Sequence, residues 1–166
     1  MNYHDITKED MLNGPGIRVV LWVSGCSHHC KNCQNPITWN EKDGLPFDEA
    51  AEKELFEALD KPFIDGITFS GGDPLFMNNR KEVCRLIRKC HDNFPNKTIW
   101  LYTGYKWEEV KDIDELKLVD VVAEGPFIEE LKDNNLEWVG SSNQRIIDVK
   151  KTFETGEVIF AKAFSK

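Results

Sequence analysis

The stretch "IRVVLWVSGCSHHCKNCQN", residues 17–35, joins an apolar run to a group of thiols. Residues 17–24 are β-branched and almost continuously apolar, which is typical of a strand covered on both faces. The loop that follows is rich in Gly, Asn and His, and it carries Cys26, Cys30 and Cys33 within eight positions. The sequence therefore predicts a buried strand that presents three closely spaced thiols at its carboxyl end.

Strands and helices alternate along the rest of the chain. Residues 47–59 and 78–93 carry apolar side chains at helical spacing, so each predicts a helix with one buried face. The two apolar stripes are Ala51, Leu55, Ala58 and Leu59 in the first segment and Val83, Leu86, Ile87 and Cys90 in the second. Further strands are predicted at residues 66–70, 98–103, 119–123, 145–149 and 157–160.

Alternating strands and helices indicate a parallel sheet with right-handed crossover connections. A closed eight-stranded barrel takes about 250 residues, and this chain has 166. No repeat, low-complexity tract or linker divides the sequence. We therefore expect an α/β fold, a partial, open (β/α)6-type barrel, in a single domain over residues 1–166.

Unusual segments follow the predicted strands. The thiol loop follows the first strand, "SGGDP" (residues 70–74) the second, "TGY" (103–105) the third and "EGPF" (124–127) the fourth. Because chemistry in parallel α/β folds collects at the carboxyl ends of the strands, these segments predict one common site.

The composition excludes several classes of protein. The net charge of −8 and the pI near 5 argue against nucleic acid as a partner, because phosphate binding needs clustered Lys and Arg. No run of 18 apolar residues predicts a membrane span, and the first ten residues lack the features of a signal peptide. We therefore expect a cytoplasmic protein with reduced thiols.

Three interpretations of the clustered thiols are open at this point. Inert packing is disfavoured by the polar loop that carries them. Structural zinc needs a fourth ligand, for which His28 or His29 is available, but no second pair of ligands follows. Cys84 and Cys90 lie on a predicted helix and are expected in or near the core. A [4Fe–4S] cluster usually takes four thiolates, so three would leave one iron open to a small chelating ligand.

The pattern C-x3-C-x2-C resembles the signature of radical S-adenosylmethionine enzymes. More narrowly, the chain resembles the activating proteins of anaerobic (class III) ribonucleoside-triphosphate reductases. The segments that carry this resemblance are "MNYHDI", "NGPGIRVVLWVSGC", "SGGDPL", "YTGY", "EGPFIEEL" and "GSSNQRIIDV", which extend to about residue 150. Residues 151–166 match nothing in that family, and their role stays open.

The resemblance implies the cofactors and their ligands. Cys26, Cys30 and Cys33 would hold a [4Fe–4S] cluster, and S-adenosylmethionine would chelate the fourth iron. Reductive cleavage would give methionine and a 5′-deoxyadenosyl radical, which takes a hydrogen atom from a backbone glycine of the reductase.

Other positions are expected at the S-adenosylmethionine site. Gly71 and Gly72 would bring backbone groups close to the methionine end, where a side chain at Gly72 would weaken binding without loss of iron. Asn32, Cys33 and Gln34 match the stretch that contacts the adenosyl group. Many related activating enzymes have an aromatic residue where this chain has Asn32, so we expect a contact through backbone or amide groups here in place of aromatic stacking on the adenine. Candidates for a ligand contact or for an ordinary structural role are Arg18, Thr103 and Glu124.

The resemblance also implies the partners. The chain is short for enclosing a small substrate, so we expect the anaerobic reductase to cover the open side of the site and an electron donor such as flavodoxin to reduce the cluster. Two alternatives are an activating enzyme for a different glycyl-radical enzyme, of the pyruvate formate-lyase type, and a small zinc-stabilised binding module.

Overall fold

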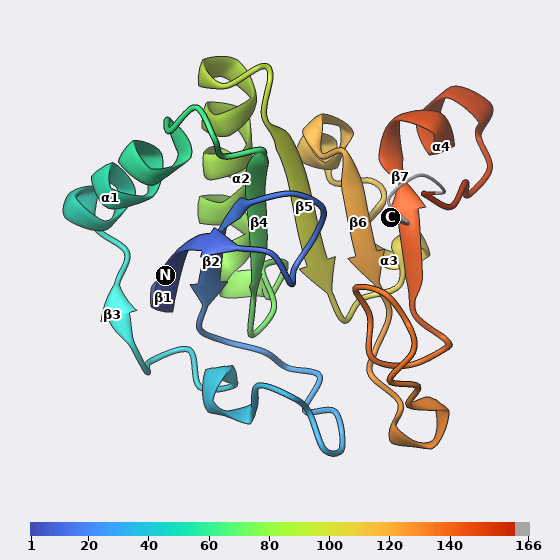
Figure 1. Ribbon diagram of the computed structural model, residues 1–166. Coiled ribbons are helices and arrows are strands. Elements are labelled where there is room, and N and C mark those ends of the chain that lie inside the picture. Colours follow the sequence, from blue (N-terminus) through green and yellow to red (C-terminus); the bar gives the residue numbers. More distant parts are fainter. Residues whose placement is uncertain (162–166) are drawn as a thin grey trace.

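The computed structural model describes residues 1–161, and one seven-stranded sheet runs through them (Figure 1). The order of the strands in the sheet is β3-β1-β2-β4-β5-β6-β7. The strands are β1 (Asn2–Asp10), β2 (Arg18–Val23), β3 (Leu45–Pro46), β4 (Gly66–Gly71), β5 (Thr98–Thr103), β6 (Val121–Glu124) and β7 (Arg145–Asp148). The helices are α1 (Glu49–Leu59), α2 (Met77–Asn93), α3 (Trp107–Val110) and α4 (Val149–Thr155), with 3-10 turns η1 (Pro36–Thr38), η2 (Asp114–Leu118) and η3 (Glu129–Leu131).

The sheet is open and mixed, so the expectation of six parallel βα units is wrong. Strands β2, β4, β5 and β6 are parallel neighbours, whereas β1 and β7 run antiparallel to β2 and β6. The predicted strand at residues 145–149 is β7, which returns from β6 without a crossover helix; such a return gives an antiparallel pair. The predicted strand at residues 157–160 forms no named strand within residues 1–161, where it contributes an isolated antiparallel bridge between Ile147 and Phe160.

Strand β1 was not predicted from the sequence. It is rich in polar residues, and only Tyr3 and Ile6 in it are buried. Its outer neighbour β3 has two residues, both exposed, so most of β1 lies at the margin of the sheet. A strand in this position needs few apolar side chains, which explains the weak signal in the sequence.

Helices α1 and α2 cover one face of the sheet, and both predicted apolar stripes are confirmed. All eight stripe residues are buried, and Cys84 is buried beside them. Asp48 accepts a hydrogen bond from Ala51 N and caps the start of α1. These stripes pack on alternate residues of the central strands: Val19, Leu21, Val23, Ile67, Phe69, Ile99 and Leu101. Within residues 1–161, no helix is both long enough and apolar enough to span a membrane.

The opposite face of the sheet contains a fully buried arginine. Arg18 begins β2, beside the first residues of β4 and β5, and its guanidinium donates to five acceptors at 2.8 to 3.2 Å. Those acceptors are the hydroxyls of Thr68 and Thr98 and the carbonyls of Pro15, Ile67 and Thr98. Arg18 therefore ties the amino ends of three strands together, at the edge of the sheet away from the thiols.

We predict that Arg18→Met lowers the free energy of unfolding by about 3 kcal/mol, because it leaves buried carbonyl and hydroxyl groups without a donor. Urea unfolding measures the change. Arg88→Met is the matched control, since Arg88 is half-exposed in an ion pair with Glu115 and its loss should cost less than about 1 kcal/mol. Equal losses in the two variants would contradict the structural role of Arg18.

Candidate functional site

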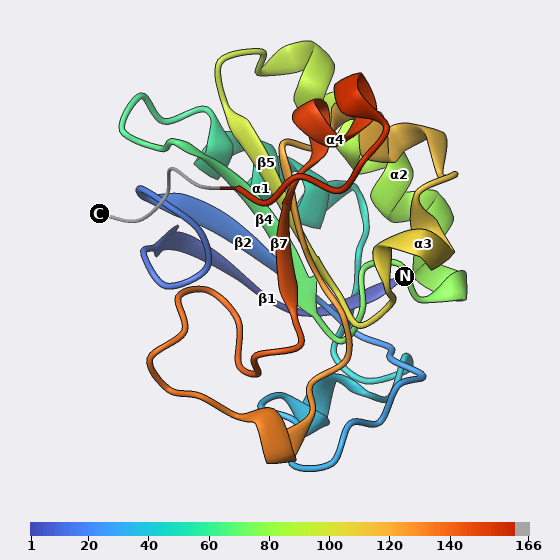
Figure 2. The same cartoon turned by 90° about the vertical axis from the view of Figure 1, so that its right-hand side faces the viewer.

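The carboxyl ends of the four parallel strands meet at one edge of the sheet, as the sequence predicts. Val23 of β2 is in register with Gly71 of β4, and Thr103 of β5 is in register with Glu124 of β6. The thiol loop and the segment 125–144 both lie beyond this edge, below the strands in Figure 1 and again in the turned view of Figure 2.

A cavity of about 610 Å³ opens at this edge, within the usual size range of ligand sites. Seven of the eight predicted site residues line it: Cys26, Cys30, Cys33, Gln34, Gly71, Gly72 and Thr103. The opposite wall comes from the segment 125–144 and includes Phe127, Trp138, Gly140 and Gln144. Asn32 does not line the cavity.

The three cysteines are free and only partly buried. Burial raises the pKa of the Cys26 thiol to about 11, against the effect of backbone hydrogen bonds from His28 and His29, which lower it. The backbone N–H of Asn35 donates to Cys33 Sγ at 3.4 Å. Three free thiols around one cavity, one of which accepts a backbone hydrogen bond, fit a group that is bound through thiolates.

The same thiols do not converge on a single point. Within the described part of the chain, no three His, Cys, Asp or Glu side chains are grouped so that they could hold one metal ion. A cubane cluster does not require such convergence, because each thiolate binds a different iron atom.

The glycine pair brings two backbones into contact. Gly71 has φ +104, and a β-carbon on it would overlap the backbone of Val23. A β-carbon on Gly72 would overlap the carbonyl oxygen of Gly25 and lie 2.8 Å from that of Thr38. Gly72 N donates to Val23 O at 2.8 Å, and Asp73 N donates to Gly25 O at 2.7 Å. The glycines are therefore required for packing against the base of the thiol loop, whatever they contact in a ligand.

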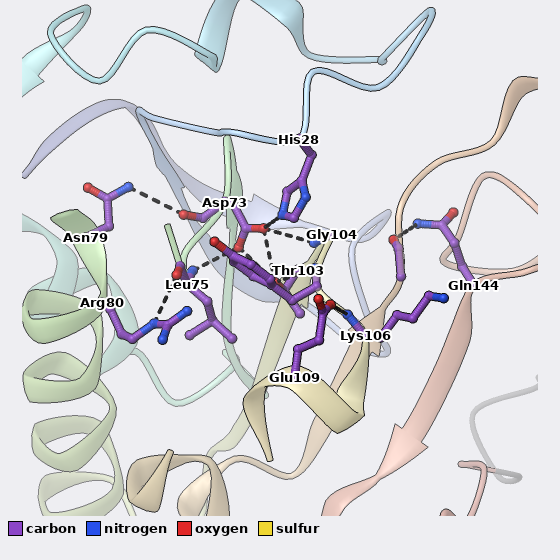
Figure 3. A network of polar contacts seen from close by, with 12 residues as sticks. His28, Asp73, Leu75, Asn79, Arg80, Thr103, Gly104, Lys106, Glu109 and Gln144 are labelled. Carbon is purple, nitrogen blue, oxygen red and sulfur yellow. Dashed lines mark hydrogen bonds and ion pairs between the residues drawn. The ribbon is translucent and has the colours of Figure 1, made fainter. Parts of the chain in front are cut away.

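Asp73 is the centre of a polar network whose members His28, Thr103 and Gly104 line the cavity (Figure 3). Its carboxylate is 1% exposed. It accepts hydrogen bonds from Leu75 N (2.9 Å), Thr103 Oγ1 (2.9 and 3.1 Å) and Gly104 N (3.0 Å), and His28 Nε2 lies 2.7 Å away. This hydrogen bond raises the pKa of His28. Asp73 does not cap α2, whose N-cap residue is Phe76.

The opposite wall is shaped by the amide side chains of "GSSNQ", residues 140–144. Gln144 Oε1 accepts from the backbone N–H groups of Gly140 and Ser141, each at 3.0 Å, and Gln144 Nε2 donates to Gly125 O. Asn143 Nδ2 donates to Pro126 O at 2.8 Å. The motif therefore closes the segment 125–144 on itself. This motif is part of the family resemblance seen in the sequence, but the spacing of its residues did not predict that it closes the segment.

The remaining candidate residues lie outside the cavity lining. Asn32 has φ +56, and its amide donates to Glu129 of the opposite wall. The ring of His29 stacks on Trp39. Glu124 is buried and accepts from Arg145 and from the N–H of Trp107. Arg18 lies at the other end of the strands.

Tyr102 and Trp138 are among the residues of the cavity lining that sequence reasoning missed. The Tyr102 hydroxyl and the Trp138 indole N–H are buried, and neither has a hydrogen-bond partner among residues 1–161. Burial raises the pKa of Tyr102. An aromatic residue in a strand or a loop gives no signal that separates such a position from ordinary packing.

Comparison with known proteins supports the same chemistry. Residues 12–147 match the family described as "4Fe-4S single cluster domain". An anaerobic ribonucleoside-triphosphate reductase-activating protein of Enterobacteria phage T4 is 47% identical over 146 residues, which cover 88% of this chain and 93% of the relative. Proteins of the same name from Escherichia coli (strain K12) and Vibrio cholerae are each 41% identical, and the matches cover 87% and 88% of this chain and 96% and 97% of the relatives. The chain therefore belongs to the family of anaerobic ribonucleoside-triphosphate reductase-activating proteins.

Proposed function

We propose that this protein activates an anaerobic ribonucleoside-triphosphate reductase by generating a glycyl radical on it. The observation that carries the proposal is the cavity in which three free cysteines face the ends of the parallel strands. Cys26, Cys30 and Cys33 would hold the [4Fe–4S] cluster as thiolates. The family match and the relatives' names support a cluster over the zinc-stabilised module, and the reductase over another glycyl-radical enzyme.

S-adenosylmethionine is the proposed second cofactor. The cluster held by the three cysteines would supply one electron for the reductive cleavage of S-adenosylmethionine to methionine and a 5′-deoxyadenosyl radical, and this radical would take a hydrogen atom from the target glycine. Gly71 and Gly72 would bring backbone polar groups to the methionine end, and Thr103 would face the same ligand. Gln34 lies on the cavity lining and could contact the adenosyl end, whereas Asn32 could reach it only through its backbone or after a change of side-chain conformation.

The wider setting is proposed on the same basis. We infer a single domain of the radical S-adenosylmethionine kind, shortened to an open sheet with four parallel strands. We also infer a cytoplasmic location and an electron donor such as flavodoxin. A protein partner suits the cavity, because a reactive radical requires the exclusion of water and a positioned target hydrogen.

Replacing Cys26, Cys30 or Cys33 by Ala should abolish both the visible absorbance of the reconstituted cluster and the formation of 5′-deoxyadenosine. The matched controls are Cys84→Ala and Cys90→Ala on α2, whose thiols are buried in the core. They should retain both properties, with a loss of stability of about 1 kcal/mol. Anaerobic iron analysis and product chromatography measure the outcome. Cleavage retained by any of the first three variants would contradict the assignment of the ligands.

The packing of the glycine pair changes the expectation for Gly72. Because even a β-carbon would meet the carbonyls of Gly25 and Thr38, Gly72→Ala should displace the base of the thiol loop. We predict a lower iron content after reconstitution, in addition to weaker S-adenosylmethionine binding. Gly156→Ala is the control, since a β-carbon there meets no atom within 4 Å, although its φ of +77 will cost some stability. Normal iron content in Gly72→Ala would show that the loop tolerates the contact.

With S-adenosylmethionine and a reductant, the reductase should gain the electron paramagnetic resonance doublet of a glycyl radical. Substitution of the target glycine of the reductase by alanine should abolish the doublet without preventing binding. If the doublet persists in that variant, or if a free metabolite is turned over efficiently without the reductase, the proposed function is wrong.

A further inference from the structure

The carboxylate of Asp73 joins three loops that come from different strands. It lies just after β4, and His28 lies in the thiol loop after β2. Thr103 ends β5, and Gly104 follows it. Figure 3 shows His28, Thr103 and Gly104 directed at the same carboxylate. A carboxylate can only accept hydrogen bonds, so the His28 ring must donate through Nε2.

The His28 ring is held on more than one side. It makes an edge-to-face contact with Tyr105, with ring centroids 4.6 Å apart. A β-carbon on Gly104 would overlap the ring, so the backbone of that residue already packs against it. The side chain of His28 is 18% exposed. The ring is thus an anchor that fixes the middle of the thiol loop to the edge of the sheet.

His28 is also connected to the thiols through its backbone. It lies midway between Cys26 and Cys30, and the backbone N–H groups of His28 and His29, as donors near the Cys26 sulfur, lower the pKa of that thiol. His29 has φ +48, an uncommon conformation for a residue with a side chain. An anchor on the neighbouring ring helps to hold this conformation and the two N–H donors at the sulfur.

We propose that Asp73 is a positioning residue, which acts through His28 to hold the thiol loop and the N–H donors on the Cys26 sulfur. This inference rests on the proposed role of Cys26 as a cluster ligand. Hydrogen bonds to a ligand sulfur stabilise the more negative, reduced state of a cluster and so raise its reduction potential. Loss of the His28 anchor should therefore lower the reduction potential of the cluster and speed the loss of iron from it.

The test compares His28→Ala, His28→Gln and Asp73→Asn in anaerobically reconstituted protein without S-adenosylmethionine. We expect a more negative potential in His28→Ala and loss of iron to a chelator about 10-fold faster than in the unmodified protein. The amide of His28→Gln can donate to Asp73 and should restore part of both properties. The double variant His28→Ala/Asp73→Asn should have the same reduction potential as His28→Ala alone, because both substitutions act on the same hydrogen bond between residues 28 and 73.

Arg80→Met is the matched control. Arg80 Nε donates to Leu75 O at 3.1 Å, and the guanidinium lies over the ring of Tyr105, so it supports the same region without a hydrogen bond to the thiol loop. Its loss should lower the midpoint of thermal unfolding and leave the reduction potential unchanged. An equal shift of the potential in Arg80→Met and His28→Ala would overturn the proposal, as would an unchanged potential and iron loss in His28→Ala.

A second measurement needs no cluster. Amide hydrogen exchange in the apoprotein should be faster across residues 26–33 in His28→Ala and in Asp73→Asn, and unchanged there in Arg80→Met. Unchanged exchange in both of the first two variants would overturn the positioning role. Failure of the unmodified protein to take up iron would instead overturn the proposed function. The exchange experiment would still show whether Asp73 and His28 hold the thiol loop in place.

Discussion

The backbone contact between the ends of β2 and β4 is the constraint on which the site depends. The two strands pair in parallel up to Val23 and Gly71, and beyond the pairing Asp73 N donates to Gly25 O. No β-carbon fits at Gly71 or Gly72. The position of the thiol loop is thus set by the register of two strands almost 50 residues apart, and a slip of one residue would turn every side chain of β4 to the other face.

The two faces of the sheet have different roles: one carries the apolar core, and the other carries the polar groups and the cavity. Helices α1 and α2 bury a continuous apolar layer on one face, and this burial supplies most of the free energy that holds the sheet together. The other face holds Arg18 with its threonine and carbonyl partners at one end and the cavity at the other. The buried guanidinium of Arg18 is stabilised by its hydrogen bonds, whereas the Tyr102 hydroxyl at the cavity has no partner among residues 1–161.

Much of this arrangement could be predicted from the sequence, and the failures have physical reasons. Strands β2, β4 and β5 are buried on both faces, so they appear as apolar runs, and both long helices show their stripes. Strand β1 could not be seen, because a marginal strand needs few apolar residues. The direction of β7 depends on how the segment 125–144 closes on itself, and that closure depends on side-chain amides of Asn143 and Gln144. Long-range hydrogen bonds of this kind leave no periodic pattern.

The two walls of the cavity differ in how firmly they are joined to the sheet. The inner wall consists of strand ends, held by buried backbone hydrogen bonds and the Asp73 carboxylate. The outer wall meets the thiol loop through Glu129, which contacts Asn32 and Lys31 at the surface. Exposed contacts of this kind contribute about 1 kcal/mol or less each. The contacts of Glu129 thus add little to the join between the two walls, whereas Trp138 of the outer wall packs edge-to-face on Trp100 of β5. Under the proposed function, a segment of the reductase would enter at this exposed margin, away from the buried groups that hold the thiol loop.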